Sequence, residues 1–125
     1  MKNKIFIFDL DDTLYKEIDF LYSAYREIAG WIELKFSLKG IYAFMLETYK
    51  EQADVFSRLI DTYDLSLTKA DLLSIYRSHR PNIRLELDTL KALEVLKQDF
   101  ILGMITDGRS ITQRNKFQAL GLEQF

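Results

Sequence analysis

The sequence predicts an α/β protein in which a helical segment is inserted between two parallel strands. Two apolar runs carry this prediction: Lys4 to Phe8 (KIFIF) and Phe100 to Ile105 (FILGMI) have the length and the β-branched and aromatic content of buried strands. Polar residues follow each run at once, Asp9 to Thr13 after the first and Thr106 to Gly108 after the second. Since ligands bind at the carboxyl ends of parallel strands, we expect both polar segments at one site.

Three helices are predicted between the strands from the spacing of apolar residues and from a capping signal. Residues 18–35 place Leu21, Tyr25, Ile28 and Ile32 at steps of three and four. A second helix is predicted over 41–60. A third should begin at Thr68, where Asp71 completes a capping-box pattern, and end near residue 78.

Two more helices are predicted around the second strand. Asp88 is expected to cap a helix that runs through Lys97. Ser110 is expected to cap another that ends at Gly121, a residue suited to the position after a helix.

The spacing of the two strands indicates an inserted domain. A strand–helix–strand unit needs roughly 30 residues, and the two strand ends lie about three times farther apart. The helix at 88–97 suffices as the crossover, so the earlier helices are surplus. We therefore expect a core made of residues 1–16 and 80–125 and a helical cap made of residues 17–79, acting as a lid that excludes water.

Composition narrows the function. The 125 residues carry a net charge of −2 with acids and bases interspersed and without a basic stripe, which disfavours nucleic acid and anionic membranes as partners. No cysteine is present, so disulfides and thiolate metal sites are excluded. No apolar stretch is long enough to span a bilayer and no signal peptide is apparent, and we expect a cytoplasmic protein.

The acidic segment after the first strand is the strongest candidate for a functional site. Burying bare carboxylates costs several kcal/mol each, so these residues should face water, a cation or a ligand. Asp9 and Asp11 are two residues apart and would point to the same side of an extended backbone. Such a pair suits a nucleophile and a general acid with Mg²⁺ between them and a phosphate.

These two segments resemble the motifs of the haloacid dehalogenase-like (HAD) hydrolase superfamily. The first motif is an apolar strand followed by D-x-D-x-T, here FIFDLDDTL, and the second is an apolar strand ending in Thr or Ser, here ILGMITDG. The order of the motifs, the helical insert and the helix after the second motif agree as well. The resemblance implies a Rossmann-like parallel-sheet core, truncated after its second strand, with a helical cap.

The resemblance also implies catalytic roles. Asp9 would be the nucleophile that forms an aspartyl-phosphate. Asp11 would protonate the leaving alkoxide and later take a proton from the water that releases phosphate, and Thr13 would orient Asp11. An Asp at position 11 favours phosphate esters over halides, so a small phosphorylated metabolite is the expected substrate and a sugar phosphomutase the less favoured alternative.

Binding roles follow from the same resemblance. The Thr106 hydroxyl and the backbone amides of Asp107 and Gly108 would hold phosphoryl oxygens. Mg²⁺ would take the Asp9 carboxylate and the Asp11 backbone carbonyl, with waters completing the shell. Asp12 should point away from Asp9 and serve a solvated or helix-capping role.

Two family motifs, a later lysine and an acidic pair, are absent from the 125 residues. Lys116 follows the second motif too closely to replace the lysine. The expectation is therefore the N-terminal portion of a longer enzyme, inactive or nearly so alone. The alternative is a non-catalytic phosphate-binding or interaction module. Two strands with open edges would also invite self-association.

The remaining candidate residues have ordinary structural interpretations. Six aromatic residues of the insert could line a substrate pocket, but their helical spacing favours the core. They are Tyr22, Tyr25, Trp31, Tyr42, Phe44 and Tyr49. His79, the single histidine, is expected at a hinge or on the surface.

Overall fold

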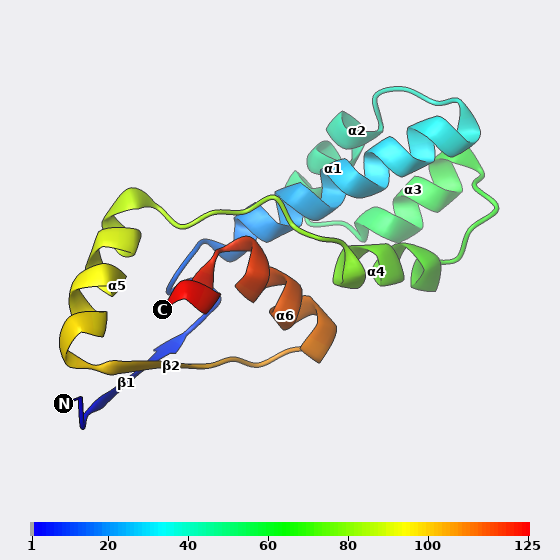
Figure 1. Cartoon of the computed structure of the whole chain (residues 1–125). Helices are drawn as coiled ribbons and strands as arrows, with labels where there is room; N and C mark the ends of the chain where they lie inside the picture. Colours follow the sequence, from blue (N-terminus) through cyan, green and yellow to red (C-terminus); the bar gives the residue numbers. More distant parts are fainter. Residues whose placement is uncertain (1) are drawn as a thin grey trace. The chain divides into compact units, whose positions relative to one another are not determined.

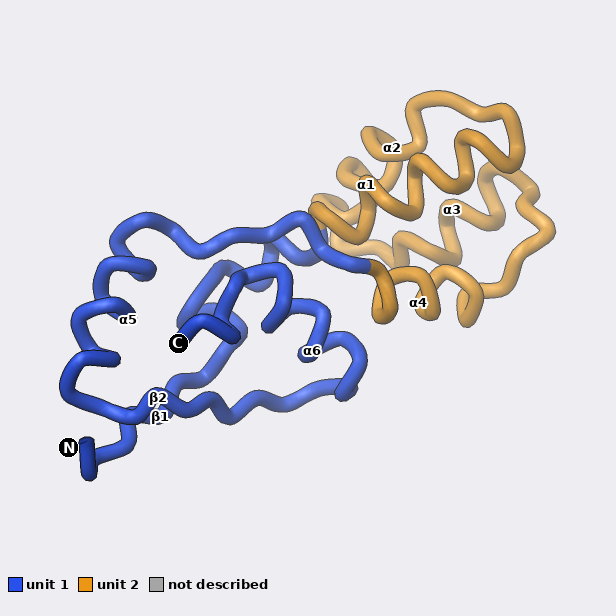
Figure 2. Tube along the Cα trace, viewed as in Figure 1, with its two compact units in different colours: residues 1–21, 80–125 blue, residues 22–79 orange. Residues whose placement is uncertain are grey.

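A computed structural model describes residues 2–125 and confirms the predicted α/β class. The chain divides into two compact units, residues 1–21 with 80–125 and residues 22–79 (Figure 2). The first unit holds a parallel two-stranded sheet and the second is helical (Figure 1). That these units act as core and cap stays a prediction. Among the described residues, no helix is both long enough and apolar enough to cross a membrane.

Strands β1 (Ile5–Asp9) and β2 (Ile101–Ile105) pair in parallel over their full length. The register runs from Ile5 opposite Ile101 to Asp9 opposite Ile105. Both strands therefore end at the same edge of the sheet, as the sequence predicts. The polar segments that follow them start side by side.

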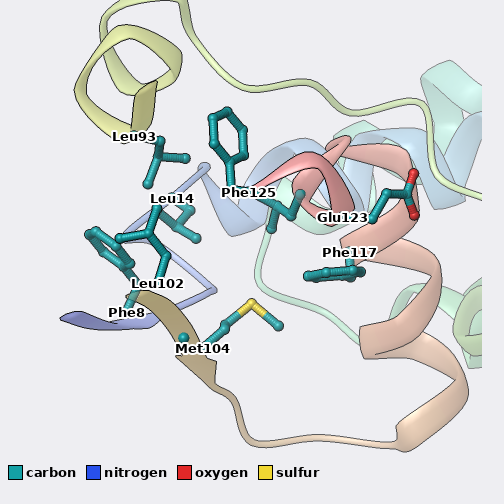
Figure 3. Close-up of a pocket in the computed structure, with 10 residues that line it drawn as sticks. Phe8, Leu14, Leu93, Leu102, Met104, Phe117, Glu123 and Phe125 are labelled. Carbon is teal, nitrogen blue, oxygen red and sulfur yellow. The ribbon is translucent and has the colours of Figure 1, made fainter. Parts of the chain in front are cut away.

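One face of the sheet packs on the apolar core of the first unit (Figure 3). Helices α5 (Leu87–Asp99) and α6 (Ser110–Ala119) and the 3₁₀ helix η1 (Leu122–Gln124) supply the opposing side chains. A partly open pocket of about 150 Å³ lies against this core. Its main apolar lining residues are Phe8, Leu14, Leu93, Leu102, Met104, Phe117, Leu122 and Phe125.

The opposite face of the sheet is exposed to solvent, so the prediction of fully buried strands is wrong. Side chains alternate between faces along a strand, so the isoleucines at alternate positions of the two paired strands share one face. Ile5, Ile7, Ile101 and Ile105 are 64%, 55%, 49% and 66% exposed. The strands look fully buried in sequence because both of their faces are apolar, but residues 2–125 leave the isoleucine face open and leave Phe6, on the packed face, 40% exposed.

Four helices build the second unit: α1 (Glu17–Phe36, which begins in the first unit), α2 (Ile41–Lys50), α3 (Val55–Tyr63) and α4 (Lys69–Ser78). The predicted single helix over 41–60 is wrong, because it breaks at residues 51–54. Gln52 adopts a left-handed φ of 59°, and the Asp54 side chain caps α3 by accepting a hydrogen bond of 3.2 Å from the Ser57 amide.

The other helix ends test the remaining capping predictions. The capping box of Thr68 and Asp71 is present, and Gly121 has a φ of 68° in the position after Leu120, the C-cap of α6, as predicted. Asp88 and Ser110 are not caps, because each lies inside its helix. Glu86 and Arg109 hold those cap positions without a side-chain hydrogen bond.

His79 is buried, at 7% exposure, so a surface position is wrong. Its Nδ1 lies 2.8 Å from the Tyr76 carbonyl oxygen, which can only accept, so Nδ1 carries the proton. Nε2 then accepts from the Ser23 hydroxyl at 3.2 Å. Burial lowers the pKa of His79 below its usual value, although the bond to Tyr76 and the charge of Glu27 act in the other direction.

This burial predicts a loss of stability in mild acid. Above the unfolded-state pKa of about 6.5, His79 is neutral in both states and its contribution is constant. As the pH falls below that value, the unfolded chain binds a proton that the folded chain resists. The free energy of unfolding should therefore fall, by at most about 1.4 kcal/mol per pH unit. Urea denaturation at several pH values between 5 and 7 measures how the free energy of unfolding changes with pH. A His79→Asn variant should lose this pH dependence, and an equal slope in both proteins would contradict the explanation.

Candidate active site

Asp9 and Thr106 lie at the ends of the two paired strands. Asp9 is the last residue of β1, is exposed, and faces Ile105 in the register. Its carboxylate accepts a hydrogen bond of 2.9 Å from the Leu10 amide. Leu10 is fully buried, which anchors the chain directly after the strand. The Asp9 carboxylate is thus held near the edge of the sheet but stays open to solvent.

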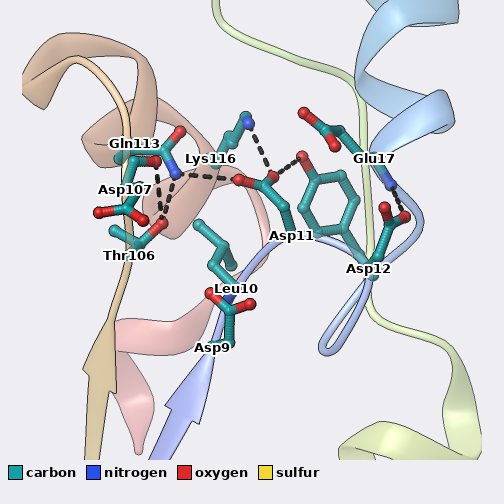
Figure 4. Close-up of polar contacts among 10 residues, drawn as sticks. Asp9, Leu10, Asp11, Asp12, Glu17, Thr106, Asp107, Gln113 and Lys116 are labelled. Atoms are coloured by element: carbon teal, nitrogen blue, oxygen red, sulfur yellow. Dashed lines mark hydrogen bonds and ion pairs between the residues drawn. The ribbon is translucent and has the colours of Figure 1, made fainter.

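Asp11 is the centre of a polar cluster, which we call the Asp11 cluster (Figure 4). Its Oδ1 accepts from the Tyr15 hydroxyl at 2.7 Å and from the Lys116 ammonium at 2.8 Å. Its Oδ2 accepts from the Gln113 amide nitrogen at 3.1 Å, and the same nitrogen donates to the Thr106 hydroxyl. The cluster therefore joins the loop after β1 to α6 and to the end of β2.

Partial burial raises the pKa of Asp11, but the hydrogen bonds from Lys116, Tyr15 and Gln113 outweigh it. The pKa of Asp11 ends below its usual value, so its carboxyl group is ionised at neutral pH.

Lys116 takes part in the Asp11 cluster. Its side chain is 5% exposed and its ammonium lies 2.8 Å from Asp11 Oδ1. That ammonium is also 4.5 Å from the centre of the Phe20 ring. Its closeness in sequence to the second motif does not prevent the contact, because α6 starts five residues after β2 and turns Lys116 toward the loop that carries Asp11. That Lys116 does not replace the later lysine of the motif pattern stays a prediction.

Sequence reasoning also missed Gln113 and Tyr15. Gln113 and Lys116 are three residues apart and share one face of α6, and that buried face is polar. A search for apolar periodicity passes over such a face. The sequence feature that could have revealed this polar face is a helix of mixed polarity directly after a candidate catalytic strand.

The structure does not bring all the predicted residues together. No hydrogen bond or ion pair within residues 2–125 joins Asp9 to Asp11 or Thr13 to Asp11. The argument from extended backbone stops at Asp9, where β1 ends. Tyr15, Gln113 and Lys116 hold the Asp11 carboxylate, where the resemblance gave that task to Thr13.

The loop after β2 is shaped around Gln113. Gly108 has a φ of 129°, and a Cβ there would come within 3.2 Å of the Gln113 side chain. Asp107 is exposed, and the backbone amides of Asp107 and Gly108 have no hydrogen-bond acceptor among residues 2–125.

Asp12 confirms its predicted capping role. Its carboxylate accepts a hydrogen bond of 2.9 Å from the amide of Glu17, the first residue of α1. Asp12 takes a left-handed φ of 59°, which aspartate tolerates better than most residues. This turn directs the chain from the candidate site into α1.

The oxygen atoms at the strand ends are of the type that binds Mg²⁺, but they supply only part of a coordination shell. Mg²⁺ prefers carboxylate and carbonyl oxygens and keeps several waters. The exposed Asp9 carboxylate and the Asp11 carbonyl are of this type, whereas the Asp11 carboxylate is engaged by Lys116. Within residues 2–125, no three His, Cys, Asp or Glu side chains come together as a metal site.

A carboxylate and a hydroxyl lie at the ends of adjacent parallel strands, with a lysine and two free amides nearby, at the edge where open α/β sheets bind ligands. Residues 6–125 match the family model described as haloacid dehalogenase-like hydrolase. The chain belongs to this family. A comparison with curated proteins found no match.

Two solved structures resemble the fold. One is YfnB of Bacillus subtilis, assigned as a HAD-hydrolase and bound to magnesium, with 19% identity and a TM-score of 0.62 over 99% of this chain. The other is a haloacid dehalogenase-like family hydrolase of Xanthomonas campestris, with 17% identity and a TM-score of 0.49 over 97% of this chain. The chain spans 61% and 57% of the lengths of these two proteins.

Proposed function

We propose that this chain carries the nucleophile and the phosphate-binding loop of a Mg²⁺-dependent phosphomonoester hydrolase acting on a small phosphorylated metabolite. The observation that supports it most is the strand register. Asp9 lies opposite Ile105, so the Asp9 carboxylate and the Thr106 hydroxyl start from the same edge of the sheet. A phosphoryl group between them would meet a nucleophile on one side and hydrogen-bond donors on the other.

In the proposed reaction, the Asp9 carboxylate attacks phosphorus and the bond from phosphorus to the ester oxygen breaks. The leaving oxygen takes a proton from Asp11, and an aspartyl-phosphate remains. Water, losing a proton to Asp11, then attacks phosphorus and restores the Asp9 carboxylate. The amides of Asp107 and Gly108 would hold the phosphoryl oxygens. Mg²⁺, bound by the Asp9 carboxylate and the Asp11 carbonyl, would neutralise phosphoryl charge.

The Asp11 cluster sets a condition on this reaction. Lys116, Tyr15 and Gln113 lower the pKa of Asp11, which makes it a weak proton donor at neutral pH. A substrate phosphate near Lys116 would compete for the ammonium and release Asp11 toward its protonated form. Aryl phosphates, whose leaving groups need little protonation, are therefore the suitable test substrates.

The experiment measures complete turnover and, separately, phosphoryl transfer to the protein, both on the full chain. One assay follows phosphate release from p-nitrophenyl phosphate with and without Mg²⁺. The other detects, by mass spectrometry after acid quench, one covalent phosphoryl group transferred from acetyl phosphate. A phosphoryl group on Asp9, with slow metal-dependent release, is the expected result.

A non-catalytic phosphate-binding module is the second candidate, favoured by the incomplete metal shell among the described residues. It predicts saturable binding of inorganic phosphate without any covalent adduct or release. If the chain shows neither phosphate binding nor a covalent adduct, both candidates are contradicted.

A further inference from the structure

A hollow of about 810 Å³ lies entirely within residues 22–79. Small-molecule pockets are usually about 300–1,000 Å³, so this volume is large enough for a ring system. The side chains come from α1, from α2 and from the turn after α2. The tyrosine, basic and amide side chains among its lining are Tyr22, Arg26, Tyr42, Tyr49, Lys50 and Gln52.

Its aromatic rings are held by neighbours and still reach solvent. Tyr49 is 39% exposed, and its ring meets the buried Tyr25 ring edge-on at 6.2 Å between centres. Tyr42 is partly buried, and the Arg26 guanidinium carbon lies 5.5 Å from the centre of its ring. This contact places a cation beside an aromatic surface, an arrangement that can accept a flat ring and a negative charge together.

The charge of the hollow is positive and uncompensated. No acidic residue lines it, and neither Arg26 nor Lys50 has an ion pair within the part of the chain that the structure describes. The nearby Glu51 carboxylate is engaged by Arg58 at 2.6 Å. Lys50 lies in the last turn of α2, where it complements the helix dipole, so Arg26 is the stronger anion contact.

The rim of the hollow includes the turn that ends α2. Gln52 has a φ of 59°, its backbone amide donates to the Tyr49 carbonyl at 2.9 Å, and the Ala53 amide donates to the Thr48 carbonyl at 3.3 Å, a common way for a helix to end. Gln52 is exposed and lines the hollow, and its side-chain amide carries both a donor and an acceptor.

We propose that this hollow binds a planar organic anion, with its ring against Tyr42 and Tyr49 and its negative group at Arg26. All the lining residues belong to residues 22–79, so the proposal does not depend on chemistry at Asp9. The ligand class is an aromatic carboxylate, sulfonate or phosphate.

The test is isothermal titration of the full chain with naphthalene-2-sulfonate, which has no phosphoester bond to cleave. One saturable site is expected. Arg26→Gln and Tyr42→Leu should each weaken binding about tenfold, and Tyr42→Phe, which keeps the ring, should bind like wild type. Inorganic sulfate and neutral 2-naphthol should bind more weakly than the planar anion.

The controls separate this site from the one at Asp9. Arg84→Gln removes an exposed arginine outside residues 22–79, and Asp9→Asn alters the candidate active site. Both should leave the affinity unchanged. Absence of saturable binding would overturn the proposal, as would equal binding of 2-naphthol or unchanged affinity in a folded Arg26→Gln variant. Loss of naphthalene-2-sulfonate binding in Asp9→Asn would place the ligand at the other site and would also overturn it.

Discussion

Asp9→Asn is expected to abolish the covalent phosphoryl adduct and to reduce any phosphate release about a thousandfold or more. The amide keeps the shape of the side chain but is not a nucleophile, and it cannot supply the charge that Mg²⁺ requires. Asp9 is exposed and makes one hydrogen bond, to the adjacent amide, so the fold should tolerate the change. Mass spectrometry after acetyl phosphate and the p-nitrophenyl phosphate assay measure the two effects.

The matched control is Asp12→Asn. It makes the same chemical change three residues away, at a carboxylate that caps α1, and asparagine caps helices as well as aspartate does. This variant should keep the adduct. An adduct that persists in Asp9→Asn would show that another residue is phosphorylated and would contradict the assignment of Asp9.

Asp11→Ala is expected to lower the free energy of unfolding by about 3–5 kcal/mol. The reason is Lys116, whose side chain is 5% exposed and whose ammonium would be left without its carboxylate. The nearby Phe20 ring, 4.5 Å away, replaces only part of that interaction. Urea denaturation at neutral pH measures the loss.

The double variant Asp11→Ala with Lys116→Met is the critical comparison. Methionine fills a volume similar to that of the lysine stem without a buried charge, so the double variant should regain most of the lost stability. Equal stability of the single and double variants would show that the unpaired charge is not the cause. Lys116→Met alone should raise the pKa of Asp11, because the strongest hydrogen-bond donor to its carboxylate is removed.

The sequence predicted the parts of the fold and of the site that depend on local rules. The strand before Asp9, the capping box at Thr68 and the left-handed Gly121 all follow from neighbouring residues, and each is present. The capping role of Asp12 is local in the same sense. Local rules also reach their limit at residues 51–54, where the aspartate cap at Asp54 outweighs an apolar periodicity that continues into α3.

Long-range contacts could not be predicted in this way. The Asp11 cluster depends on Lys116, which is 105 residues away, and on a helix whose buried face is polar. No periodicity of apolar residues marks such a face. The exposure of Ile5 and Ile101 likewise depends on which elements are available to cover the sheet, a property that the strands themselves do not encode.

The hydrogen bond between Ser23 and His79 has a consequence for the order of folding. These residues stand at the two ends of the unit 22–79, and their side chains lie 3.2 Å apart. Between Asp9 and Ile101 the chain has 91 residues, of which 58 belong to that unit and 33 do not. Once residues 22–79 have folded, the loop that must close before β1 meets β2 is effectively much shorter. The entropic cost of closing it falls by about 0.9 kcal/mol, which favours helix assembly before strand pairing.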